Sequence, residues 1–216
     1  MRPRLLSLFG VAITLGIIGG LVLPPPAAAK EPVSTTALIA EVRQAFTLTG
    51  ERVPPEIFRD FGDGNLAESV PIWVTVDVRA AIGSNLYADE IRQSGDWIVQ
   101  RKVATATMNG MEETAYKYIG ATENGLLVVL AAYNGGGSGD FVTLHILDIG
   151  AASAFDSDGS VYDRINLTNI RGIALGDRWE GEVRITKNAV GVITTRQGPA
   201  DRSGLRKEMS IEARRP

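Results

Sequence analysis

Apolar residues near the start of the chain recur at the spacing of one helix face. Four of them predict a helix over residues 37–47, with Ser34, Thr35 and Thr36 offering N-caps and Gly50 as its stop. The proline pair that follows favours one further helical turn within residues 54–61. The four residues on the helix face are Leu38, Ile39, Val42 and Phe46.

From residue 71 onward apolar and polar residues alternate one by one, which is typical of half-buried strands. Turn sequences rich in Gly, Asn and Asp separate the runs, and no helical pattern lies between them. A mostly β fold follows: an antiparallel meander of about nine to ten strands, closed as a barrel or folded as a sandwich, after a short N-terminal helix. We expect the strands at 71–79, 86–92, 97–108, 114–122, 126–133, 141–149, 162–174, 179–187, 190–196 and 205–213.

Two of these runs, 126–133 and 141–147, are apolar at nearly every position. Such strands need cover on both faces, so we expect them to form the central hairpin, joined by the glycine-rich residues 134–140. One face would meet the opposite sheet or barrel wall, and the N-terminal helix would cover the other. If that helix docks elsewhere, a second copy of the chain would supply the cover, which makes a homodimer the alternative.

The N-terminus has the pattern of an export signal. Arg2 and Arg4 precede an apolar run over residues 5–23, and Ala27 and Ala29 form a small-residue cleavage site. Removal after Ala29 would release a soluble periplasmic or secreted protein. The apolar run is also long enough to cross a bilayer, so an uncleaved anchor in the inner membrane is the alternative. The chain thus divides into a signal at 1–29, a helical segment and linker at 30–70, and one β domain at 71–216.

Composition narrows the possible chemistry. The chain has no Cys and one His, which excludes a disulfide scaffold, a thiolate metal site, a Cys nucleophile and the usual His-rich zinc centres. The formal net charge is −3, and an exported protein is not expected to meet nucleic acid. Any site must therefore be built from carboxylates, hydroxyls, aromatic rings and the single imidazole.

Aromatic residues supply the candidates for a ligand wall. Tyr116 and Tyr118 share one face of their predicted strand beside Thr114, and Trp97 begins the preceding strand. His145, the single imidazole, lies inside the most apolar run of the chain. The alternative for these residues is the core, where His145 would be a buried histidine with one hydrogen bond.

An acidic turn supplies the candidate for a metal site. Asp156, Asp158 and Asp163 cluster around Gly159, as a hard cation such as calcium would require. An EF-hand register fails, because it would place Ala154 and Ile165 where carboxylates belong. Either a calcium turn of another kind binds here, or the aspartates cap the backbone of a hairpin loop.

These patterns favour a non-catalytic binding or protein-interaction module of the bacterial cell envelope, with an envelope protein or a small ligand as partner. No catalytic residue is nominated, and the membrane enters only if the N-terminal segment stays uncleaved. The alternative is a hydrolase of envelope glycans or another small substrate, using carboxylates as acid and base. Its candidate carboxylates are Asp156, Asp158, Asp163, Asp177 and Glu180.

Overall fold

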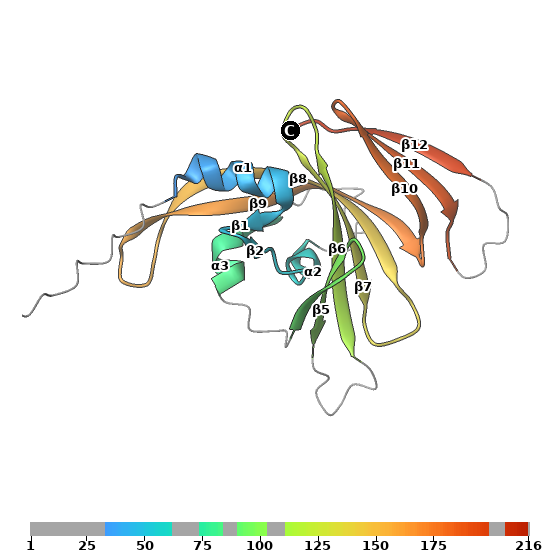
Figure 1. The fold of residues 1–216 in the computed structure, drawn as a ribbon, viewed down its shortest axis with the longest axis horizontal. Helices are drawn as coiled ribbons and strands as arrows, with labels where there is room; N and C mark the ends of the chain where they lie inside the picture. The colour runs from blue at the N-terminus through green and yellow to red at the C-terminus, as the bar shows by residue number, and fades with distance from the viewer. Residues whose placement is uncertain (1–32, 62–73, 84–89, 103–110, 199–205, 216) are drawn as a thin grey trace, which may run out of the picture. The chain divides into compact units, whose positions relative to one another are not determined.

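The structure is a computed structural model that describes residues 33–61, 74–83, 90–102, 111–198 and 206–215. All of these residues belong to one compact unit, Val33–Pro216 (Figure 1). The predicted signal at 1–29 lies outside the described residues. Within the described part of the chain, no helix is both long enough and apolar enough to cross a membrane.

The N-terminal helix predicted at 37–47 is α1, Thr35–Ala45. The Ser34 hydroxyl accepts a hydrogen bond from the Ala37 amide at 3.2 Å, so Ser34 is the N-cap among the three candidates. Phe46, rather than Gly50, ends the helix: it adopts a left-handed conformation with φ 55° and donates its amide to the Val42 carbonyl. Its buried ring compensates for that conformation. The predicted turn at 54–61 contains α2, Ile57–Asp60.

The strand predicted at 71–79 is wrong at its C-terminal end. Strand β3 covers Val74–Asp77, and helix α3 begins at Val78 and ends at Gly83. The Asp77 carboxylate accepts hydrogen bonds from the amides of Arg79 and Ala80 at 3.0 and 3.4 Å. Asp77 therefore starts a helix by capping it, and this local effect overrides the alternation of apolar and polar residues.

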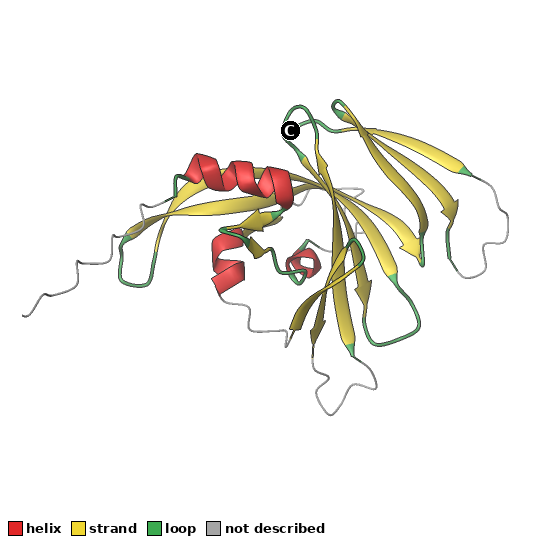
Figure 2. Cartoon of the chain, viewed as in Figure 1, coloured by secondary structure: helices red, strands yellow, loops and turns green. Residues whose placement is uncertain are grey.

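The strands form antiparallel sheets, shown in yellow in Figure 2. The largest has seven strands in the order β3-β9-β8-β7-β6-β5-β4, and a second has the order β10-β11-β12. A small pair joins β1, Thr47–Leu48, to β2, Glu51–Arg52. The remaining bounds are β4 Glu90–Ser94, β5 Trp97–Lys102, β6 Glu112–Ala121, β7 Leu127–Asn134, β8 Phe141–Phe155, β9 Val161–Asp177, β10 Glu180–Thr186, β11 Ala189–Arg196 and β12 Lys207–Glu212.

This arrangement confirms the mostly β, antiparallel prediction and selects the sandwich. Among the described strands, β3 and β4 are the two edges of the large sheet and do not pair with each other, so no barrel closes. The predicted strands match observed ones where the structure describes them, whereas 71–73, 86–89, 103–108 and 205 lie outside the described residues. The largest difference in length is in β8 and β9, which pair as far as Phe155 and Val161.

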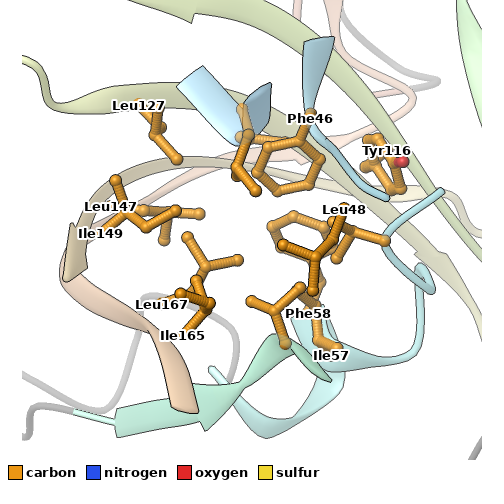
Figure 3. Close-up of a cluster of buried hydrophobic side chains, with 14 of the residues drawn as sticks. Phe46, Leu48, Ile57, Phe58, Tyr116, Leu127, Leu147, Ile149, Ile165 and Leu167 are labelled. Carbon is orange, nitrogen blue, oxygen red and sulfur yellow. The ribbon is translucent and has the colours of Figure 1, made fainter. Parts of the chain in front are cut away.

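The central hairpin is β7 and β8, and both of its faces are covered as predicted. On one face Leu127, Leu147 and Ile149 pack against buried residues of α1 and α2 in a single cluster (Figure 3). This face is called the helix-covered face below. The buried side chains of α1 are Leu38 and Val42.

On the opposite face Val128, Leu130, Leu144 and Ile146 pack against the three-stranded sheet. That sheet contributes Val190, Val192 and Ile211, all between 0% and 3% exposed. This side is called the sheet-covered face below. The two covers expected from the sequence are thus both present within one chain.

Candidate functional site

The helix-covered face changes from apolar to polar along the strands. Near α1 its residues are aliphatic, whereas toward the glycine-rich connection between β7 and β8 they include hydroxyls, an imidazole and exposed rings. Strand register aligns these residues in rows across β6, β7 and β8. Three successive rows are Tyr118–Val129–His145, Tyr116–Ala131–Thr143 and Thr114–Tyr133–Phe141.

Helix α2 lies over the polar end of this face and leaves a partly open cleft of about 430 Å³ between itself and the strands. We call it the α2 cleft. Ala131 occupies the middle row with only a methyl group, so the floor of the cleft stays low between Tyr116 and Thr143. The lining residues are Phe58, Arg59, Thr114, Ala131, Ala132, Tyr133, Phe141, Thr143 and His145.

A buried carboxylate organises the charged edge of the cleft. The Glu112 side chain is only 7% exposed, and its Oε1 lies 2.8 Å from Arg59 Nη2. The same oxygen accepts a hydrogen bond from the Tyr133 hydroxyl at 3.0 Å, and Lys102 Nζ lies 3.9 Å from Oε2. The Arg59 guanidinium also lies 5.7 Å from the centroid of the Tyr133 ring, a cation–π contact. Glu112 therefore already neutralises the positive charge of Arg59 without a ligand.

Burial and the hydrogen bond to Glu112 raise the pKa of Tyr133, so its hydroxyl stays protonated at neutral pH. The proton is the one donated to Glu112. Tyr133 thus lines the cleft and donates its hydroxyl proton to the Glu112 carboxylate.

His145 lies deep at the inner end of the cleft and is 1% exposed. The centroids of the Phe58 and Phe61 rings lie 5.4 and 5.8 Å from its own, and its Nδ1 lies 3.3 Å from Asn169 Oδ1. Burial lowers the pKa of His145 to about 4, so the ring is neutral at pH 7. A neutral imidazole that donates from Nδ1 to an amide oxygen carries a lone pair on Nε2, which makes it a hydrogen-bond acceptor.

Two buried threonines in the wall have unused hydrogen-bonding capacity. Thr114 and Thr143 are 5% and 8% exposed, and both line the cleft. Within the described part of the chain, neither hydroxyl makes a hydrogen bond. The two hydroxyl oxygens keep some contact with solvent, so both are available to hydrogen-bond a ligand in the cleft.

Of the residues predicted to form a ligand wall, the structure brings only His145 to the cleft. Tyr116 is 2% exposed and packs against Phe46 and Phe58, and burial raises its pKa. The Tyr118 hydroxyl donates to the Arg43 carbonyl, and burial raises its pKa to about 12. Trp97 packs with the cluster on the sheet-covered face.

Most of the cleft residues were not predicted from the sequence, although two signals were present. Thr114 lies on the same strand face as the two nominated tyrosines, and Thr143 and His145 interrupt an otherwise apolar run at alternate positions. Arg59 and Glu112 have no such signal, because only the docking of α2 brings them together.

The aspartates predicted to bind calcium accept hydrogen bonds from neighbouring protein groups. Asp156 Oδ1 accepts hydrogen bonds from the amides of Asp158 and Ser160, and hydrogen bonds from the side chain and amide of Ser160 lower the pKa of Asp158 to about 2. Asp163 accepts from the Thr35 hydroxyl at 3.0 Å, which ties the β8–β9 hairpin to the start of α1. No group of three or more potential metal-binding side chains occurs among the described residues. Calcium binding here stays a prediction.

The remaining carboxylates nominated for hydrolysis also have partners of their own. Asp177 Oδ1 accepts a hydrogen bond from the Asp140 amide at 2.8 Å. Arg196 Nη1 lies 3.0 Å from Glu180 Oε1, in an ion pair whose side chains are 42% and 61% exposed. These contacts are typical of a solvated surface.

No protein-family model, curated protein or solved structure matches the chain. Its function is therefore inferred from the chemistry of the α2 cleft.

Proposed function

We propose that this chain is an exported, non-catalytic binding module of the bacterial cell envelope, and that it takes a small ligand into the α2 cleft. The observation that carries the proposal is a cleft of about 430 Å³ with a mostly apolar wall and a few buried polar groups. Small-molecule sites commonly have this size and this composition.

The chemistry of the cleft favours binding over catalysis. A general base works best with a pKa near the working pH, and the pKa of His145, lowered to about 4, is far below it. Its partner is the amide of Asn169 rather than a carboxylate. Glu112 is engaged by Arg59 and Tyr133, so it is held as a structural anion.

Export is supported by the N-terminal pattern of Arg2, Arg4, the apolar run 5–23 and the small residues before Lys30. Expression of the full chain in a bacterium, followed by fractionation and intact-mass measurement, tests it. A soluble protein whose mass begins at Lys30 is the expected result. A full-length mass in the membrane pellet would instead support the anchored alternative.

Ligand binding is tested by thermal melting of the purified protein against a panel of small charged and uncharged compounds. A ligand that binds the native state raises the melting temperature with concentration. The variant Ala131→Leu fills the floor of the cleft and should abolish that rise. Ala80→Leu makes the same change at an exposed position on α3 and should keep it.

An equal rise in both variants would place binding outside the α2 cleft and contradict the proposed site. If no compound in the panel raises the melting temperature of the unmodified protein, small-ligand binding fails. The hypothesis of a protein-interaction module would then be tested by a search for envelope partners.

A further inference from the structure

The charges at the α2 cleft disfavour a charged ligand. Arg59 is the charged residue in its wall, and Glu112 and the Tyr133 ring already hold the guanidinium. An anion would have to compete with Glu112, a carboxylate only 7% exposed, and a cation would face Arg59. Loss of Arg59 as its partner would leave Glu112 uncompensated in a poorly solvated position, which is costly, whereas the Arg59 side chain is 40% exposed.

The unpartnered polar groups of the cleft match a hydroxyl. Thr114 and Thr143 can each donate and accept, and neutral His145 can accept at Nε2. A ligand O–H both donates and accepts, so it can satisfy groups of both kinds. With so few polar groups in the wall, one or two hydroxyls suffice, whereas a sugar would bring many more than the wall can satisfy.

The mouth of the cleft favours a flat apolar body. Tyr133 and Phe141 face each other across β7 and β8, and they are 37% and 56% exposed. Glycines in the connecting loop lie close to both rings: a Cβ at Gly135 would sit 3.1 Å from the Tyr133 hydroxyl oxygen, and one at Gly139 3.0 Å from the Phe141 ring. The loop therefore backs the two rings, which stand where an entering ring compound would meet them.

We propose that the ligand of the α2 cleft is an uncharged, mostly apolar ring compound that carries a hydroxyl group, of the phenol or cyclic alcohol class. The inference rests on the proposed function, because it specifies the chemistry of the same site. The hydroxyl of the ligand lies among Thr114, Thr143 and His145, and its ring lies between Phe58 and the mouth rings of Tyr133 and Phe141.

Three probes of one shape test this assignment at pH 7: 2-naphthol, 2-methylnaphthalene and 2-naphthoate. Their affinities for the purified protein are measured by fluorescence titration. We expect 2-naphthol to bind at least about ten-fold more tightly than either other probe, because a site built for a hydroxyl rejects analogues that lack it. Thr143→Val and Thr114→Val remove one hydroxyl each with little change in shape. They should weaken 2-naphthol binding and leave 2-methylnaphthalene binding unchanged.

Thr75→Val, on β3 outside the cleft lining, is the matched control and should change neither affinity. Equal binding of 2-methylnaphthalene and 2-naphthol would overturn the hydroxyl assignment, and tighter binding of 2-naphthoate would identify Arg59 as an anion receptor instead. If Ala131→Leu abolishes the probe binding seen in either case, the probe binds in the α2 cleft and the proposed function still holds. Failure of all three probes overturns this inference, and the wider compound panel decides separately whether the cleft binds any ligand.

Discussion

The central hairpin of β7 and β8 has two faces with different covers and different chemistry. On the sheet-covered face Leu130, Leu144 and Ile146 are at most 4% exposed, and on the helix-covered face Thr143 and His145 are at most 8% exposed. The same two strands supply both sets at alternating positions. At these positions the two faces are similarly buried, whereas toward the glycine-rich loop the helix-covered face opens at Tyr133 and Phe141, which are 37% and 56% exposed.

The two covers differ in continuity. The three-stranded sheet places Val190, Val192 and Ile211 against one face as part of a regular hydrogen-bonded array. Among the described residues the other cover consists of α1, the β1–β2 pair and α2, a helix of four residues. The α2 cleft lies between α2 and the strands. Hollows of about 320 and 240 Å³ also border the sheet-covered face, near Ile146 and near Trp97 and Ala132.

The largest expected change in stability is at Leu144, and its neighbour Thr143 on the opposite face serves as the comparison. Leu144→Ala removes a fully buried side chain from the sheet-covered face and should lower the free energy of unfolding by about 2–5 kcal/mol. Thr143→Val, one residue away, should change it by less than about 1 kcal/mol, because the hydroxyl that it removes has no partner. Urea unfolding at pH 7 measures both. A loss at Thr143 as large as that at Leu144 would mean that the two faces are equally packed.

A second test uses the titration of His145. Its pKa is about 4 in the folded protein and 6.5 without burial, so below pH 6.5 the unfolded chain binds a proton that the folded protein does not. Stability should therefore fall as the pH drops from 6.5 to 4, by at most about 3 kcal/mol from this group. The groups packed against the ring, Phe58, Phe61 and Asn169, do not titrate in this range.

The measurement is urea unfolding between pH 7.5 and 4 for the unmodified protein and for His145→Gln. The variant retains the other acid-sensitive groups and lacks this one, so its stability should decline less steeply. Parallel curves for the two proteins would show that His145 is accessible to a proton in the folded state, and that the inner end of the cleft is open to water.

The smallest expected effect concerns the attachment of the helical cover. Ser34→Ala removes the N-cap of α1 and should destabilise the protein by about 1 kcal/mol. Ser210→Ala, at an exposed position of β12, is the matched control and should have an effect of less than about 0.5 kcal/mol. Thermal and urea unfolding give both values. If Ser34→Ala has no effect, α1 contributes little to the closure of the helix-covered face.

The alternation of apolar and polar residues by itself determined most of the strands. It also determined the central place of β7 and β8, because strands that are apolar on both sides need two covers. The run of three candidate N-caps at 34–36 also marked the start of the first helix. These features depend on neighbours in the chain, so a single sequence contains them.

Only the tertiary structure decided which cover lies on which face, that the sheets form a sandwich, and that Asp77 ends a strand by capping a helix. It also decided the site: the pairing of Arg59 with Glu112, and the alignment of Thr114 with Tyr133, join segments far apart in the chain. The physical reason is that apolar burial is non-directional. Periodicity reports which side of a strand avoids water, but a sheet, a helix or a ligand can satisfy that side equally well.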